Sequence, residues 1–89
     1  MNLIYKNNGT SKYTRQQDKT LTIGELKEIV GGDIDIMYLP IENAYLVYNA
    51  KHTELKQGFF NSTATEKLVT NYPDIKIRIY GTAFITDTL

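Results

Sequence analysis

The strongest constraint on the fold of this chain is a strict alternation of residue types near its C-terminus. One set of positions is apolar or small: Ile75, Ile77, Ile79, Gly81, Ala83 and Ile85. The other set is mostly polar or aromatic: Lys76, Arg78, Tyr80, Thr82, Phe84 and Thr86. Because successive side chains of a β-strand point to opposite faces, this pattern predicts one long strand over 75–85. We expect Gly81 to bend this strand or to let another backbone approach closely.

The best-marked helix is predicted over residues 23–30. Thr22 is a natural N-cap and Glu25 follows three residues later, so each side chain can accept a hydrogen bond from a backbone N–H at the helix start. Gly31-Gly32 ends the helix, since glycine adopts the left-handed conformation of a helix terminus without penalty. The expected apolar face consists of Ile23, Leu26, Ile29 and Val30.

Two strands are predicted after this helix. Residues 33–39 alternate at first and then become apolar on both faces, which indicates a central strand. Pro40 ends it, and residues 44–48 are rich in aromatic and β-branched types, which favours an antiparallel partner strand. The polar residues 49–58 predict a turn with a short edge segment.

A second helix is predicted to begin near residues 61–63 and to end before Pro73, because the residue before a proline is disfavoured in a helix. Thr63 and Glu66 repeat the capping-box spacing. The expected buried stripe is Ala64, Leu68, Val69 and Tyr72.

The N-terminal residues predict a hairpin. Leu3-Ile4-Tyr5 precedes Asn8-Gly9, a dipeptide typical of type I′ turns, and Tyr13-Thr14 follows. The alternative is that residues 1–19 form a mobile arm.

Together these elements predict an α+β fold, with a mostly antiparallel sheet of about four to five strands and two short helices on one face. The chain has 89 residues, so we expect a single domain over 1–89, in which 1–19 is the hairpin or arm. A core this small supplies only a few kcal/mol of net stability, which favours a homo-oligomer.

Composition excludes several classes of protein. The chain has no cysteine, hence no disulfide scaffold, thiol chemistry or cysteine-bound metal. No run approaches the roughly 18 apolar residues of a membrane span, and the N-terminus has no signal-peptide pattern, so we expect a cytoplasmic protein without a membrane partner. Ten cations balance ten anions, which argues against duplex DNA as a partner.

The charges are unevenly distributed along the chain. Residues 1–19 carry four cations and one anion, whereas residues 20–48 carry one cation and five anions. These two oppositely charged segments either align neighbouring subunits or form two separate solvated faces.

The chain also resembles a known family. The motifs that carry the resemblance are Thr20-Leu21, Leu26, Ile29-Val30-Gly31-Gly32, Ile34, Val47-Tyr48-Asn49, Leu55, Asn61-Ser62-Thr63-Ala64-Thr65, Leu68 and Ile79-Tyr80-Gly81-Thr82-Ala83. In order and spacing, residues 20–86 resemble domain of unknown function family 3846, which occurs mainly in phages, plasmids and integrated mobile elements of bacteria. The chain departs from the family pattern after Asn49, where the family tends to carry acidic residues and a glycine and this chain has Ala50-Lys51-His52. The resemblance implies a phage or mobile-element accessory protein and brings no established activity with it.

Residues suited to catalysis are few. His52 is the one histidine, and Ser11 and Ser62 stand in no local pattern for nucleophilic attack. No second histidine stands at metal-ligand spacing, so we expect no metal and no cofactor. We interpret His52 as an exposed turn residue or, alternatively, as part of a site. Asp33 and Asp35 are either the solvated side of a strand or a cation site.

Seven residues are candidate ligand contacts: Lys76, Arg78, Tyr80, Phe84, Asn49, Asn61 and Thr65. The first four share the outer face of the predicted strand, where interleaved cations and aromatics can stack a base and neutralise a phosphate. The same pattern also describes a protein interface, a covered face or a plain solvated surface. Asn61 and Thr65 lie near a helix N-terminus, which favours anions, although capping alone explains Asn61.

These features predict a non-enzymatic accessory protein of a phage or mobile element that binds or sequesters a host component in the host cytoplasm. In its most specific version, the protein is a counter-defence protein that holds a nucleotide-type immune signal between subunits. Two alternatives stay open. One is a protein–protein interaction module that inhibits a host enzyme, and the other is a weak binder of single-stranded nucleic acid.

Overall fold

The computed structural model describes residues 2–6, 8–14, 19–54 and 59–89. Within these ranges the strands are β1 (Asn2–Tyr5), β2 (Ser11–Tyr13), β3 (Ile34–Leu39), β4 (Ala44–Asn49) and β5 (Ala83–Thr86). They form one antiparallel sheet in the order β2-β1-β5-β4-β3. The helices are α1 (Ile23–Val30), the short 3₁₀ helix η1 (His52–Glu54) and α2 (Ser62–Asn71). The predicted α+β class and antiparallel sheet are confirmed.

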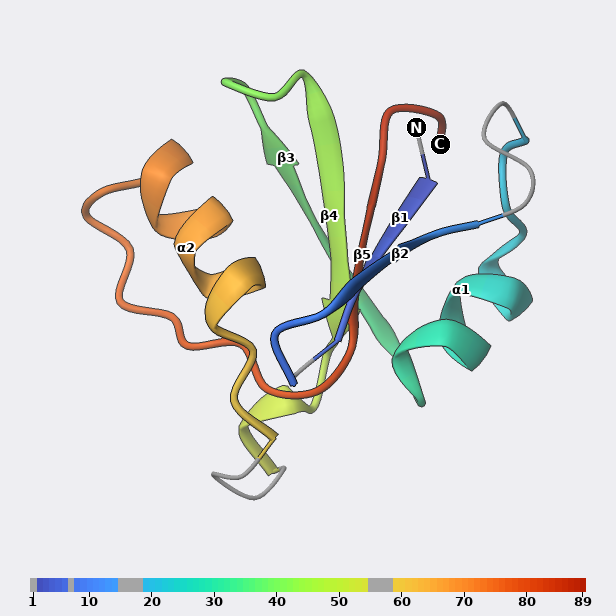
Figure 1. Ribbon diagram of the computed structural model, residues 1–89, viewed down its shortest axis with the longest axis horizontal. Helices are drawn as coiled ribbons and strands as arrows, with labels where there is room; N and C mark the ends of the chain where they lie inside the picture. Colours follow the sequence, from blue (N-terminus) through green and yellow to red (C-terminus); the bar gives the residue numbers. More distant parts are fainter. Residues whose placement is uncertain (1, 7, 15–18, 55–58) are drawn as a thin grey trace.

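The two helices cover opposite faces of the sheet, so the molecule has three layers (Figure 1). Under α1 lies a cluster made of Leu26, Val30, Val47 and Phe84. Under α2 lies a larger cluster that includes Ala64, Leu68, Leu46, Tyr48, Ala83 and Ile85. The predicted placement of both helices on one face is therefore wrong. Val47 and Phe84 make the face of β4 and β5 opposite to α2 apolar as well. This face is buried only if a second helix, α1, packs on it.

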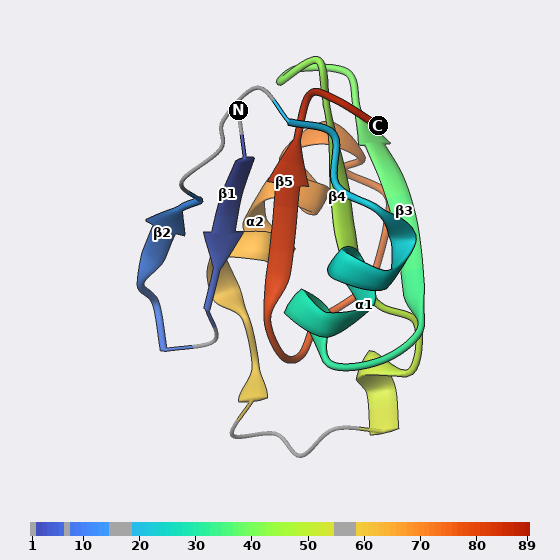
Figure 2. The same ribbon diagram turned by 90° about the vertical axis from the view of Figure 1, so that its right-hand side faces the viewer.

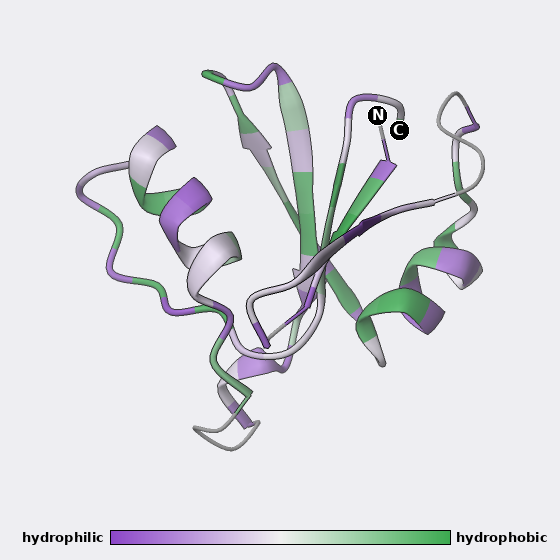
Figure 3. Cartoon of the chain, in the orientation of Figure 1, coloured by the Kyte–Doolittle hydropathy of each residue, from purple (hydrophilic) through white to green (hydrophobic). Residues whose placement is uncertain are grey.

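Hydrophobic residues are concentrated in the central strands (Figure 3). Leu46 and Val47 of β4 and Phe84 of β5 are fully buried, although they point to different faces. Within the described ranges, no helix combines the length and apolar character that crossing a bilayer requires.

The predicted strand over 75–85 is only partly a strand. Residues 75–79 are irregular, Tyr80 forms an isolated bridge with Phe60, and the regular strand covers Ala83–Thr86. β1 ends at Tyr5 and β4 ends at Asn49, and both pair with this part of the chain only within residues 83–86, so no described strand pairs with residues 75–79. Gly81, at φ 84°, has the left-handed backbone that separates the two parts. The alternation of residue types indicates which side chains face the core. It does not indicate which backbone groups form hydrogen bonds with a neighbouring strand.

The predicted central strand at 33–39 is an edge strand. β3 pairs with β4 alone among the described strands, and it runs down one side of the molecule (Figure 2). Ile36 and Tyr38 remain 45% and 41% exposed. Its partner strand and the antiparallel pairing are confirmed.

The N-terminal hairpin is confirmed, but its connection is longer than the predicted two-residue turn. The Lys6 N–H donates to the Thr10 carbonyl at 2.9 Å, and Gly9 has a positive φ whereas Asn8 does not. Residues 15–18 and 55–58, to which the predictions of an arm and of the 49–58 turn partly apply, lie outside the described residues.

The termini of α1 follow the prediction. Thr22 and Glu25 form both hydrogen bonds of the capping box, and Gly31 takes the left-handed terminal conformation. Ile23 is 65% exposed, however, so the buried face consists of Leu26 and Val30.

At α2 the cap is Asn61, whose side chain accepts from the Ala64 N–H, so the predicted capping box of Thr63 and Glu66 is wrong. The helix ends at Asn71, ahead of Pro73, as predicted. Of its expected buried stripe, Ala64 and Leu68 are buried, whereas Val69 is exposed.

Candidate ligand-binding groove

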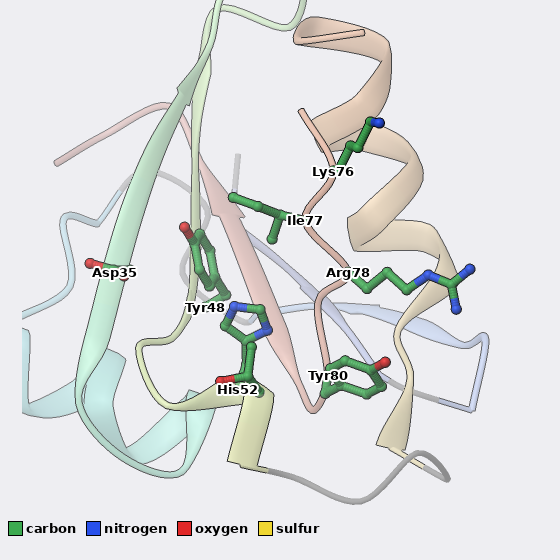
Figure 4. Close-up of a pocket in the computed structure, with 8 residues that line it drawn as sticks. Asp35, Tyr48, His52, Lys76, Ile77, Arg78 and Tyr80 are labelled. Carbon is green, nitrogen blue, oxygen red and sulfur yellow. The ribbon is translucent and has the colours of Figure 1, made fainter. Parts of the chain in front are cut away.

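A groove of about 600 Å³ opens between the β3–β4 hairpin, η1 and the segment 76–80 (Figure 4). Its lining residues are Asp35, Tyr48, His52, Thr53, Lys76, Ile77, Arg78 and Tyr80. This volume lies in the range of small-molecule sites in proteins, about 300–1,000 Å³. The groove is the strongest candidate site among the described residues.

The sheet register positions one wall of the groove. Asp35 of β3 lies directly opposite Tyr48 of β4, so both side chains point to the face that α2 covers. After β4 the chain turns sharply, because the Asn49 side chain accepts from the Lys51 N–H at 2.8 Å and the Glu54 N–H donates to the Lys51 carbonyl. This turn brings η1, and with it His52, against Tyr48.

The opposite wall is the irregular segment after α2. The Ile79 N–H donates to Oγ1 of Thr65 at 2.9 Å, and the Asn61 N–H donates to the Ile79 carbonyl at 2.8 Å. These hydrogen bonds tie the segment to α2, and Ile77 and Ile79 pack on the core cluster that contains Leu46 and Tyr48 of β4. The groove opens beside them, between Tyr48 and the residues 76–80.

An aromatic row forms the floor and one end of the groove. The ring centroids of Tyr48 and His52 lie 5.4 Å apart in an edge-to-face arrangement, and those of His52 and Tyr80 lie 6.3 Å apart in near-parallel planes. Phe60 continues the row, with its ring centroid 5.7 Å from that of Tyr80. Tyr48 and His52 are buried, so Tyr80, which is partly exposed, is the groove ring that offers stacking surface to a planar ligand.

His52 is not the exposed turn residue that the sequence favours. It is only 7% exposed, and its Nδ1 is buried without a hydrogen-bond partner in the described part of the chain. A buried polar atom without a partner costs about 1–3 kcal/mol, so native proteins rarely retain one. A ligand that donates a hydrogen bond to Nδ1 would remove that cost.

Charged groups stand at two rims of the groove. Asp35 lies on the β3 side, and Lys76 and Arg78 lie on the side of the irregular segment (Figure 4). The Arg78 side chain extends away from His52, and its Cζ lies 5.8 Å from the centroid of the Phe60 ring. All three side chains are exposed, so the cations can reach an anionic group at the mouth but do not line the floor.

Burial raises the pKa of the Tyr48 hydroxyl, and the nearby Asp35 carboxylate adds to the effect. Tyr48 therefore stays a neutral hydroxyl at physiological pH. It presents a hydrogen-bonding group beside the aromatic floor, not a negative charge.

Three of the seven predicted contacts, Lys76, Arg78 and Tyr80, line this groove. Phe84 does not: it is fully buried under α1, so its predicted outward position is wrong. Thr65 accepts the hydrogen bond from Ile79 described above and holds the groove wall from behind.

Asn49 and Asn61 serve the fold. The Asn49 amide donates to the Val30 carbonyl at 3.3 Å and so ties the end of α1 to β4. The fully buried Asn61 amide donates to the carbonyls of Tyr5 and Gly81 at 2.9 and 2.8 Å while its oxygen caps α2. With both of its amide N–H groups and its oxygen engaged, Asn61 is not available to grip an anion, and Asn49 does not line this groove.

The residue patterns do not indicate Tyr48 or Ile77 as groove residues, and they offer Asp35 only as a cation site and His52 mainly as an exposed turn residue. Tyr48 and His52 are four residues apart across a turn, and the turn geometry alone brings their rings together. The available signal was the polar Asn49-Ala50-Lys51 stretch, which follows a strand and predicts a reversal of the chain.

Among the described residues no nucleophile stands beside His52 with a hydrogen bond to it, and no group of three or more His, Asp or Glu side chains gathers as a metal site. Comparison with family models, curated proteins and solved structures finds no match to this chain.

Proposed function

We propose that this chain is a non-enzymatic binding protein that sequesters a small nucleotide-type ligand in the groove between β4 and residues 76–80. The base would stack on Tyr80, the partly exposed ring of the aromatic row, and the phosphate would lie at the mouth near Lys76 and Arg78. The single observation that carries the proposal is the buried, unpartnered Nδ1 of His52 within an aromatic groove of about 600 Å³.

The biological setting of the proposal rests on the family resemblance of residues 20–86. An accessory protein of a phage or mobile element that removes a nucleotide signal would act against host defence by stoichiometric capture. Such a protein needs affinity and abundance, and it needs no catalytic residues.

Isothermal titration of the full chain with cyclic nucleotides and ADP-ribose derivatives tests the proposal. We expect saturable heat for at least one of these ligands. Tyr80→Ala should weaken that binding by about 1–3 kcal/mol, the usual contribution of one stacked base. Arg78→Ala should weaken it by a similar amount, as loss of a charged hydrogen bond to phosphate does.

Matched controls come from the opposite end of the sheet. Tyr13→Ala and Lys12→Ala in β2 remove an exposed ring and an exposed cation far from the groove. Both should bind like the unaltered chain. Flat heats for every ligand, or equal losses in the β2 variants, would contradict the proposal.

A second candidate is single-stranded nucleic acid, and one observation favours it. Phe60, Tyr80 and Arg78 form a row of two rings and a cation that continues past the mouth of the groove, and Phe59, the next residue in the chain to Phe60, is 46% exposed. This candidate predicts an affinity that falls steeply with salt. Fluorescence anisotropy with a labelled oligonucleotide separates the two, because binding that does not change between low and moderate salt excludes the nucleic-acid candidate.

A further inference from the structure

The outer edge of β3 has an unusual combination of features for the edge of a sheet. It is six residues long, and within the described residues no strand pairs with it. Figure 2 shows β3 along one side of the molecule with no ribbon beyond it. A long edge of this kind is a template for pairing with another strand.

The backbone groups that face this edge follow from the hydrogen bonds of the hairpin. The Ala50 N–H donates to the Asp33 carbonyl at 2.7 Å, so residues 33, 35, 37 and 39 face β4. The N–H and C=O groups of Ile34, Ile36 and Tyr38 therefore face outward. In agreement, the Tyr38 carbonyl accepts from the Tyr72 hydroxyl and not from β4.

The side chains on the same three residues are apolar or aromatic. Ile36 and Tyr38 are 45% and 41% exposed, and Ile34 lies beside them, partly packed on the α1 cluster. Outward backbone groups and exposed apolar side chains thus occur at the same positions of one strand.

We propose that β3 pairs with β3 of a second copy of this chain, antiparallel and about a two-fold axis through Ile36. A two-fold axis suits this edge because antiparallel pairing makes one strand its own complement. Ile36 then lies opposite Ile36 of the second copy, and Ile34 lies opposite Tyr38. The carbonyl of Tyr38 keeps its bond to Tyr72 and has a second lone pair for the new strand.

Side-chain charge and the missing N–H of proline favour this register over the two registers whose axis is shifted by one residue. An axis through Asp35 would place two carboxylates directly opposite each other, which is destabilising. An axis through Met37 would place Ile34 opposite Pro40, which has no N–H to donate. With the axis at Ile36, Asp35 lies opposite the second copy's Met37.

The pairing has a consequence for the groove. Asp35 stands on its rim and points to the α2 face, so the second copy's Met37 would extend that rim from across the new strand pair. The two grooves then open on the same face of a ten-stranded sheet, one on each side of the axis. This proposal does not depend on which ligand the groove binds.

Sedimentation velocity of the full chain tests the pairing. The expected result is a particle of twice the 10.2 kDa chain mass. Ile36→Lys should halve that mass, because it places two ammonium groups next to each other at the axis. Ile23→Lys is the matched control, since Ile23 is 65% exposed on α1 and should leave the dimer intact.

A cross-linking variant keeps the test decisive if Ile36→Lys fails to fold. The chain has no cysteine, so Ile36→Cys introduces one thiol at the axis. Residues opposite each other in a hydrogen-bonded pair have Cα atoms about 5.5 Å apart, within disulfide range. Oxidation should give a covalent dimer that Ile23→Cys does not give. A monomeric unaltered chain, a dimer insensitive to Ile36→Lys, or equal cross-linking of both cysteine variants would overturn the proposal.

Discussion

Among single residues, the buried polar side chains Asn61 and His52 differ in whether their polar atoms have hydrogen-bond partners. Asn61 is fully buried and uses its amide and its oxygen in three hydrogen bonds to α2, β1 and Gly81. His52 is almost as buried, but its Nδ1 has no partner in the described part of the chain. The first residue therefore stabilises the fold, and the second has unused binding capacity.

His52→Phe separates fold from binding. Phenylalanine keeps a ring between Tyr48 and Tyr80 but removes the unsatisfied nitrogen, so we expect the free energy of unfolding to stay level or rise by about 1 kcal/mol. Ligand affinity should fall, because the acceptor for a ligand N–H is lost. Urea unfolding and titration of the same preparation measure both quantities. Unchanged affinity would show that Nδ1 makes no contact with the ligand.

Asn61→Ala should destabilise the protein by about 3 kcal/mol, because it removes a helix cap and leaves two buried carbonyls with fewer donors. Urea denaturation measures the loss, and Ser62→Ala, one residue along on the exposed start of α2, should change stability by only about 0.5 kcal/mol. If Asn61→Ala were as stable as the control, the side chain would be free for the ligand role that the sequence suggested.

Among the helices and strands, residue patterns predict local features such as helix caps well, but they predict the pairing of distant strands poorly. The capping box and the Gly31 terminus of α1 involve residues a few positions apart, and they are found as predicted. Residues 75–79 have an equally clear pattern, yet they form no strand. A strand needs a partner strand beside it, and β1 and β4, which are remote in sequence, end at Tyr5 and Asn49 and pair only within residues 83–86.

The α1 cap predicts a specific dependence of stability on pH. Hydrogen bonds from Thr22, the backbone N–H first, lower the pKa of Glu25 below its usual value, so the folded state favours the carboxylate. The unfolded chain then binds the proton more readily, and this contribution to stability is present above the ordinary pKa and is lost as pH falls through the folded pKa.

We therefore expect Glu25→Gln to be less stable than the unaltered chain at neutral pH and to close much of that gap near about pH 2. Thermal unfolding followed by circular dichroism measures the difference at each pH. In a Thr22→Ala background, which lacks the side-chain cap, the gap should shrink at neutral pH as well. A gap that stays constant with pH would mean that the Glu25 carboxylate does not cap α1.

At the scale of the whole molecule, the sheet is covered on both faces, and its two central strands supply both cores. Phe84 and Val47 serve the α1 cluster, whereas Ile85 and Leu46, their neighbours in sequence, serve the α2 cluster. β4 and β5 therefore each link the two clusters, and we expect damage to one face to affect the other through these strands.

Phe84→Ala should destabilise the protein by about 3–5 kcal/mol, since the ring is fully buried and its removal leaves a cavity. Loss of this size is a large fraction of the total stability of a small domain, so the groove on the other face should lose its shape too. Phe59→Ala, at a ring 46% exposed, is the control and should change stability by only about 0.5 kcal/mol. Calorimetric unfolding compares the two, and similar losses would show that Phe84 is not a core residue.

The helix limits, the antiparallel hairpins and the α+β class of this protein follow from its amino-acid pattern, because caps, turns and side-chain alternation act between residues that are near one another in the chain. Tertiary packing was needed to place β3 at an edge, the helices on opposite faces and Phe84 in the interior. It also decided that Tyr48, His52 and Tyr80 meet in one groove, because that meeting requires a turn, a 3₁₀ helix and an unpaired return segment to pack together.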